Sequence, residues 1–151
     1  GTLDYAPGHG AYMPWITPLT DGSFIASQHV GSGLGANDCR IEILRSPDGQ
    51  QWHNEGQIAD QCSNYSYRMP QIHALPDGRL LMTATRFACS DVQLFDPESE
   101  ALQQPEMLLY FSEDLGIRWS KPHILPVELP PDRYTANGAG MLLQLRHGRW
   151  M

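Results

Sequence analysis

The sequence has few cysteines, few basic residues and no long apolar run, and each shortage excludes a class of protein. Its 151 residues include 3 cysteines, with no CxxC pair and no Cys/His spacing typical of zinc, so no metal site and no cofactor are expected. Ten Lys and Arg against 17 Asp and Glu give a net charge of -7, which disfavours nucleic acid as a partner. No run approaches the roughly 18 apolar residues of a membrane-spanning helix, so no such segment is expected.

The three cysteines, Cys39, Cys62 and Cys89, leave the redox compartment open. One disulfide plus a free thiol would fit an exported protein, whereas three small buried hydrophobes would fit any compartment. The first residues lack the basic and then apolar pattern of a signal peptide.

The pattern of apolar residues favours strands over helices. No stretch keeps a helical period over three turns, and prolines interrupt the candidates. The apolar residues come in runs of strand length, separated by dipeptides whose glycine can take the positive φ of a tight turn. The runs are 23–26, 41–44, 80–84, 107–111 and 141–145, and the dipeptides are Asp21-Gly22, Asp48-Gly49, Asp77-Gly78 and His147-Gly148. The sequence therefore predicts an all-β fold.

An internal repeat is the strongest feature of the chain. The ten residues that begin at Met13 recur at Met69, 56 positions later, with Met, Pro, Ile, Leu, Asp and Gly conserved between the two copies and no gap. A degraded third copy covers 141–151, where an apolar run is again followed by a Gly-Arg-Trp turn and strand start. The repeat indicates successive copies of one structural unit.

A second motif recurs after the repeat. Residues 112–119 have the form Ser-x-Asp-x-Gly-x-x-Trp, and residues 46–52 have the same form one residue shorter. Ser and Asp side chains can satisfy turn amides, Gly takes the positive φ, and Trp covers the adjacent strands, so we expect a structural role. The residues concerned are Ser46, Asp48, Gly49, Trp52, Ser112, Asp114, Gly116 and Trp119.

With these two motifs, the chain resembles the sialidase superfamily of BNR or Asp-box repeats. The resemblance implies an all-β, six-bladed β-propeller of four-stranded antiparallel blades. About two and a half blades would be present: 11–66, 67–133 and the start of a third at 134–151. On this interpretation the chain is a fragment, inactive alone, whose missing partner is the remainder of the propeller, because half a ring leaves blade faces uncovered.

The segment Tyr67-Arg68-Met69-Pro70 is similar to the Phe/Tyr-Arg-Ile-Pro motif of that family. The resemblance implies that Arg68 binds the substrate carboxylate, for which a planar guanidinium is suited. Arg86, on the following strand, would support the site. An ion pair between blades or a solvated position at a strand end is the alternative role for Arg68.

Two aspartates compete for the acid/base role that the resemblance implies. Asp91 follows Arg86 by five residues, but Ala84 stands where the family has an acidic residue. Asp38 ends a glycine-rich stretch in the earlier repeat, but Tyr12 there occupies the place of the arginine. The nucleophilic Tyr/Glu pair of the family would lie outside this chain.

The implied function is that of an exo-α-sialidase-like glycoside hydrolase in the full-length parent, which removes terminal acidic sugars from glycans and is secreted or periplasmic. A non-catalytic propeller that binds glycan or protein is the alternative, because this fold hosts both. The six histidines form no i,i+4 pair, so we expect them at the surface or in turns.

Overall fold

The computed structural model describes residues 6–58, 61–89, 98, 103–126, 128, 130, 145–146 and 148–149. This part of the chain contains only β-strands, so the all-β prediction is confirmed, and no helix there could cross a membrane. The strands are β1 (Gly10–Pro18), β2 (Phe24–Gly31), β3 (Arg40–Ser46), β4 (His53–Gln57), β5 (Tyr65–Ala74), β6 (Leu80–Ala88), β7 (Glu106–Ser112) and β8 (His123–Leu125).

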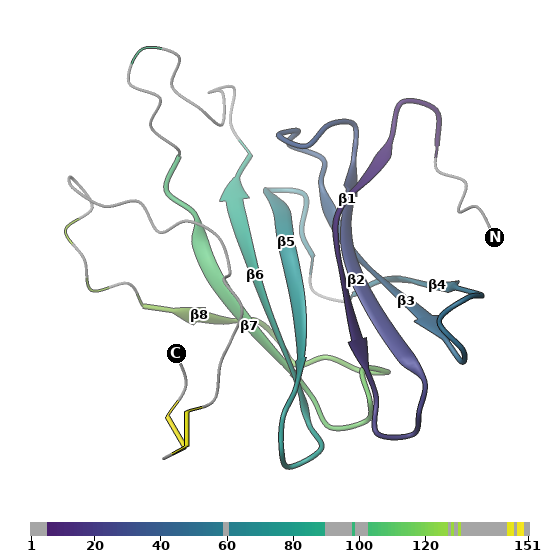
Figure 1. Ribbon diagram of the computed structural model, residues 1–151. Coiled ribbons are helices and arrows are strands. Elements are labelled where there is room, and N and C mark those ends of the chain that lie inside the picture. Colours follow the sequence, from purple (N-terminus) through teal and green to yellow (C-terminus); the bar gives the residue numbers. More distant parts are fainter. Residues whose placement is uncertain are drawn as a thin grey trace.

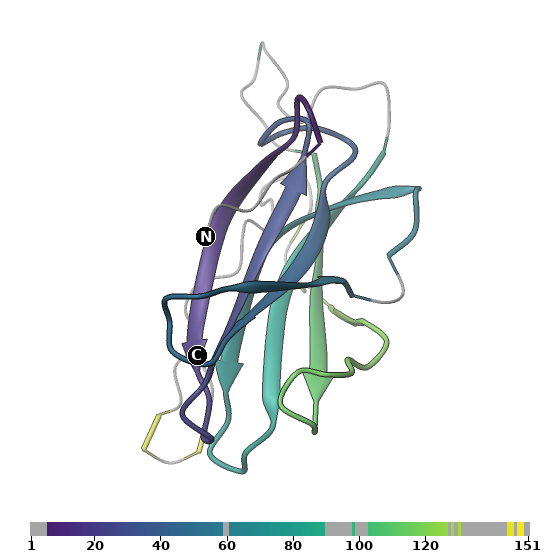
Figure 2. The ribbon, with the colours of Figure 1, turned by 90° about the vertical axis from the view of Figure 1, so that its right-hand side faces the viewer.

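The strands form two antiparallel four-stranded sheets, in the orders β1-β2-β3-β4 and β5-β6-β7-β8 (Figure 1). We call them the first and second sheets. β5 of the second sheet lies against β1, β2 and β3 of the first, and the view turned by 90° shows the first sheet in front of the second (Figure 2). The predicted four-stranded antiparallel units are therefore confirmed, whereas a closed ring is not formed by the described residues. Most of the predicted third unit, 134–151, lies outside them.

The core lies between the two sheets. Strands alternate their side chains between two faces, so every second residue of β3, β6 and β7 points into this layer. The hydrophobic cluster consists of Leu19, Ile25, Ile41, Ile43, Ile58, Tyr67, Ile72, Leu80, Met82, Ala84, Leu108 and Tyr110. Burial of these side chains from both sheets makes the pair one folding unit.

Hydrogen bonds to the main chain of β5 fix how the sheets stack. The carbonyl oxygen of Ile72 accepts from Trp15 Nε1 at 2.9 Å and from Thr17 Oγ1 at 2.5 Å. Two residues earlier on β5, the carbonyl oxygen of Pro70 accepts from Ser27 Oγ at 2.9 Å. β5 is an edge strand, so one row of its main-chain groups has no partner strand. The side chains of the first sheet donate hydrogen bonds to the carbonyl groups of that row.

The first strand of each sheet, β1 or β5, which we call the inner strand, carries the same irregularity at an equivalent place of the repeat. Met13 has φ 51 and Met69 has φ 50, each at a register shift of β1 or β5. A non-glycine residue with positive φ is uncommon and typical of bulges. The repeat therefore extends to backbone conformation.

Three tight turns share the same hydrogen bonds, and two of them follow β1 and β5. The amide of Leu19 donates to Ser23 O at 2.8 Å and that of Leu75 to Arg79 O at 2.8 Å. In the third copy the amide of Leu145 donates to Arg149 O at 2.7 Å. The glycines of these turns, Gly22, Gly78 and Gly148, have positive φ as predicted.

The two Ser-x-Asp turns, 46–52 and 112–119, also share one hydrogen-bond pattern. In the second, Ser112 Oγ donates to Asp114 Oδ1 at 2.9 Å and accepts from the Gly116 amide at 2.8 Å. In the first, Ser46 Oγ accepts from the Gly49 amide at 2.8 Å. The 112–119 turn also packs on the first sheet, since Arg45 Nη2 donates to Leu115 O at 2.6 Å.

Candidate functional site

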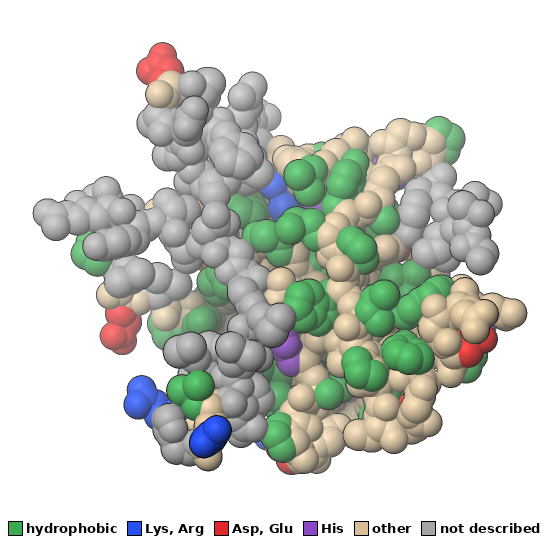
Figure 3. All heavy atoms as spheres, in the orientation of Figure 1, with side chains coloured by type: hydrophobic (Ala, Val, Ile, Leu, Met, Phe, Trp, Pro, Cys, Tyr) green, Lys and Arg blue, Asp and Glu red, His purple; other side chains and the backbone are tan. Residues whose placement is uncertain are grey.

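The predicted site residues that the structure describes lie at the end of the sheets opposite the tight turns, at the top of Figure 1. There the loop between β2 and β3 (residues 32–39) meets the first residues of β5. Figure 3 shows basic side chains recessed between hydrophobic ones near this end. Asp91 lies outside the described residues, so its predicted role stays a prediction.

The loop 32–39 is fastened to the second sheet. Ser66 Oγ donates to the Ala36 oxygen at 2.7 Å, and the Tyr67 amide donates to Cys39 O at 2.9 Å. A Cβ on Gly31, where the loop begins, would stand 2.7 Å from Cys39 Sγ, so the close approach of the chain requires glycine there. The glycine-rich stretch is thus a packed part of the site.

Arg68 is buried between the sheets, with 4% of its surface exposed. Its Nη2 donates to the Ala36 oxygen at 2.9 Å, and its guanidinium carbon lies 5.0 Å from the centroid of the Phe87 ring. No carboxylate of the described residues lies within ion-pair distance of it. Burial lowers the pKa of Arg68, but a guanidinium stays charged. Its other hydrogen bonds go to Ser66 Oγ, so neutral oxygens are the partners of Arg68 among the described residues, and a buried cation of this kind is costly.

Arg86, the second predicted arginine, already has a carboxylate. Its Nε donates to Glu106 Oε2 at 2.5 Å, and the guanidinium lies 4.0 Å from the centroid of the Tyr65 ring. The two arginines therefore differ: Arg86 is held in a pair across β6 and β7, and Arg68 is not.

Asp38 is held at the end of the same loop. The Ser32 amide donates to its Oδ1 at 3.0 Å, and Ser32 Oγ does so at 3.0 Å. His9 Nε2 lies 3.2 Å from Asp38 Oδ2. Partial burial acts to raise the pKa of Asp38, but the hydrogen bonds from Ser32 outweigh it, so the pKa lies below its ordinary value. These contacts hold the loop at Asp38, and its predicted acid/base role stays a prediction.

His29 is a site residue that the sequence did not indicate. It is fully buried on β2, and its Nδ1 accepts from the Met69 amide at 3.4 Å while Tyr12 stacks on its ring at 5.5 Å. Burial, with a contribution from the charge of Arg68, lowers the pKa of His29 to about 4. The prediction that the histidines lie at the surface or in turns is wrong for His29 and for His73, which is also buried on β5. Their place on the buried face of a strand is decided by sheet stacking.

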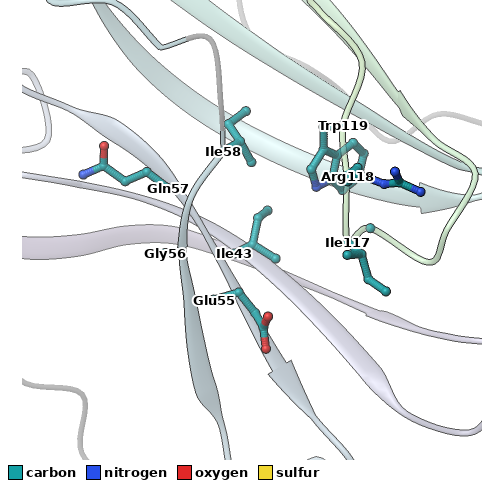
Figure 4. Close-up of a pocket in the computed structure, with 9 residues that line it drawn as sticks. Ile43, Glu55, Gly56, Gln57, Ile58, Ile117, Arg118 and Trp119 are labelled. Carbon is teal, nitrogen blue, oxygen red and sulfur yellow. The ribbon is translucent and has the colours of Figure 1, made fainter.

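A hollow of about 440 Å³ lies away from these residues, between β4 and the 112–119 turn (Figure 4). Its lining includes the apolar residues Ile43, Ile58 and Trp119 and the charged residues Glu55 and Arg118. None of the predicted substrate-binding or acid/base residues lines it.

The described residues hold no group of three or more His, Cys, Asp or Glu that could bind a metal ion. All three cysteines are free thiols: Cys39 is buried, Cys62 is exposed and Cys89 is partly exposed. The polar groups at the loop end are two guanidinium groups, hydroxyls, an imidazole, main-chain carbonyls and the carboxylates of Asp38 and Glu106.

Comparison with known proteins identifies the fold. No protein-family model matches the chain, and no curated protein matches it. A solved structure from Dyadobacter fermentans, described as a protein of unknown function, aligns with a TM-score of 0.72 and 16% identity over 96% of this chain and 46% of that chain.

Two carbohydrate-active enzymes also align. A Hadza microbial sialidase matches with a TM-score of 0.58 and 19% identity, over 76% of this chain and 25% of the enzyme. A Penicillium chrysogenum α-L-arabinanase, solved with arabinobiose, matches with a TM-score of 0.55 and 21% identity, over 73% of this chain and 30% of the enzyme.

These likenesses define a class by fold. The two sheets correspond to part of a β-propeller, and the two enzymes named above, a sialidase and an arabinanase, are glycosidases. The chain spans less than half the length of each of these three structures. Because the arabinanase aligns as well as the sialidase, the fold does not single out sialidases.

Proposed function

We propose that the chain is part of a β-propeller glycoside hydrolase that removes terminal acidic sugars from glycans outside the cytoplasm. Arg68 carries the proposal: it is a buried guanidinium at the loop end of the sheets, with no carboxylate of the described residues to pair with it. A sugar carboxylate would supply the missing counter-charge through two parallel hydrogen bonds.

The other predicted residues have distinct roles in this proposal. Arg86, paired with Glu106, supports the strand beside Arg68. Asp91 is the better acid/base candidate, because Asp38 is held as an anion by Ser32. The neighbouring glycosidase folds support a sugar as the ligand.

The test is the release of sialic acid from a fluorogenic sialoside by the longest stable polypeptide that contains this chain. We expect turnover, and a fall in kcat/KM of at least about a hundredfold in Arg68→Ala, because a charge-assisted bidentate contact is lost. Arg79→Ala is the matched control, since Arg79 is an exposed arginine in a tight turn at the opposite end. No turnover by the complete protein would reject the enzyme.

A non-catalytic propeller that binds acidic glycans is the second candidate. The lowered pKa of Asp38 favours it, because a general acid must hold a proton near neutral pH. Calorimetric titration with sialyllactose separates the candidates: binding that requires Arg68, without turnover, identifies the binding protein.

A further inference from the structure

Three polar side chains on the second sheet contain buried atoms without a hydrogen-bond partner: Gln71 Oε1, His73 Nε2 and Thr83 Oγ1. Gln71 and His73 are two residues apart on β5, and Gln71 stands opposite Thr83 on β6. Since side chains alternate along a strand and opposite residues share a face, the three lie on one face of the second sheet. We call them the polar stripe.

The internal repeat gives each member of the polar stripe an equivalent in the first sheet. With the offset of 56 residues, Gln71 corresponds to Trp15, His73 to Thr17 and Thr83 to Ser27. Those three equivalents are the side chains that donate hydrogen bonds to the main chain of β5, at Ile72 and Pro70. In the first sheet, the side chains at these three positions bind the inner strand of the second sheet. In the second sheet, the side chains at the same positions have atoms without a partner.

We propose that the polar stripe is the docking surface for the inner strand of a third repeat, the strand that leads into the turn at Leu145. That turn repeats the hydrogen bonds of the two earlier turns, so a third unit follows the second. The strand itself lies outside the described residues, and the proposal rests on the stripe and the repeat.

The chemistry of the stripe fits a strand edge better than an apolar cover. Gln71 Oε1 can only accept, Thr83 Oγ1 can donate, and His73 Nε2 can do either according to its tautomer. A strand edge presents main-chain amides and carbonyls in alternation, so it supplies both kinds of partner. An apolar cover would leave all three groups buried at a cost.

The test is whether the substitution Thr83→Val lowers or raises the melting temperature of the longest stable polypeptide that contains this chain. Removal of a hydroxyl that donates to a strand lowers the melting temperature, by about 3 °C, whereas removal of an unpartnered buried hydroxyl leaves it unchanged or raises it. Thr17→Val is the matched control, because Thr17 Oγ1 donates to Ile72 O. A melting temperature of Thr83→Val at or above that of the unmodified protein overturns the proposal.

Peptide-resolved hydrogen exchange gives an independent readout. In Thr83→Val the amides of the strand before Leu145 should exchange about fivefold faster, and in Thr17→Val the amides of β5 should respond instead. Faster exchange of β5 alone in both variants would show that the stripe does not hold the third strand.

Discussion

Gly116 of the 112–119 turn lies against Ile25 of the first sheet. A Cβ at Gly116 would stand 2.5 Å from Ile25 Cδ1, and the residue has φ +84. We predict that Gly116→Ala lowers the free energy of unfolding by about 3 kcal/mol, because it adds left-handed strain to an overpacked contact. Denaturant unfolding measures the change.

Gly78→Ala is the control for this prediction. Gly78 has φ +87, but a Cβ there would meet nothing within 4 Å. Its cost should be limited to the backbone conformation, about 1 kcal/mol. Equal losses in the two variants would contradict the contact between Gly116 and Ile25.

Asp114 should make part of the stability dependent on acid pH. Hydrogen bonds from the side chain and the amide of Arg118, with one from Ser112, lower the pKa of Asp114 from 3.8 to about 2. Because the folded-state pKa is depressed, the stabilisation is present above pH 4 and is lost as the pH falls toward 2. Melting temperatures over this window should fall less steeply in Asp114→Asn than in the unmodified protein.

His29 should add a second pH dependence in a higher window. Its folded-state pKa of about 4 lies below the ordinary 6.5, so the unfolded chain binds a proton first. Stability should fall as the pH drops from 6.5 to 4, by about 3 kcal/mol. His29→Gln, whose amide oxygen can still accept from the Met69 amide, should flatten the profile between these values. An unchanged profile would mean that His29 is not held neutral.

The two arginines at the loop end should respond in opposite directions to removal of their charge. Arg68→Leu should leave the free energy of unfolding unchanged or raise it by up to about 2 kcal/mol, because no described carboxylate loses a partner and Ser66 still donates to Ala36 O. Arg86→Leu should lower it by about 1 kcal/mol, since Glu106 is left unpaired but 40% exposed. Thermal melts compare the two. A strong loss in Arg68→Leu would indicate that Arg68 is structural.

Much of the fold could be predicted because its signals are local. The turn glycines, the repeat from Met13 to Met69 and the strand-length runs each depend on a few adjacent residues. The strands extend beyond the apolar runs, as β2 does through Ser27 and His29, because the second sheet covers those polar residues. At these positions the contact with the second sheet, and not the polarity of the residue, decides that the side chain is buried.

The candidate site was less predictable because it depends on contacts between the two sheets. The equivalence of Arg68 with Tyr12 follows from the repeat, and both lie at the loop end. The carbonyl of Ala36 above Arg68, however, comes from a loop of the other sheet, more than thirty residues away in sequence. Such a contact depends on how the sheets stack, which no local pattern specifies.

The shared acceptor at Ile72 limits how the sheets can slide. Successive carbonyls along a strand point to opposite sides, so a shift of β5 by one residue would turn an amide toward Trp15 and Thr17, both of which donate. Only displacements by whole pairs of residues restore an acceptor, and these would also carry the bulge at Met69 away from its equivalent in β1. The contact at Ile72 therefore restricts the stacking of these two sheets to discrete positions, two residues apart along β5.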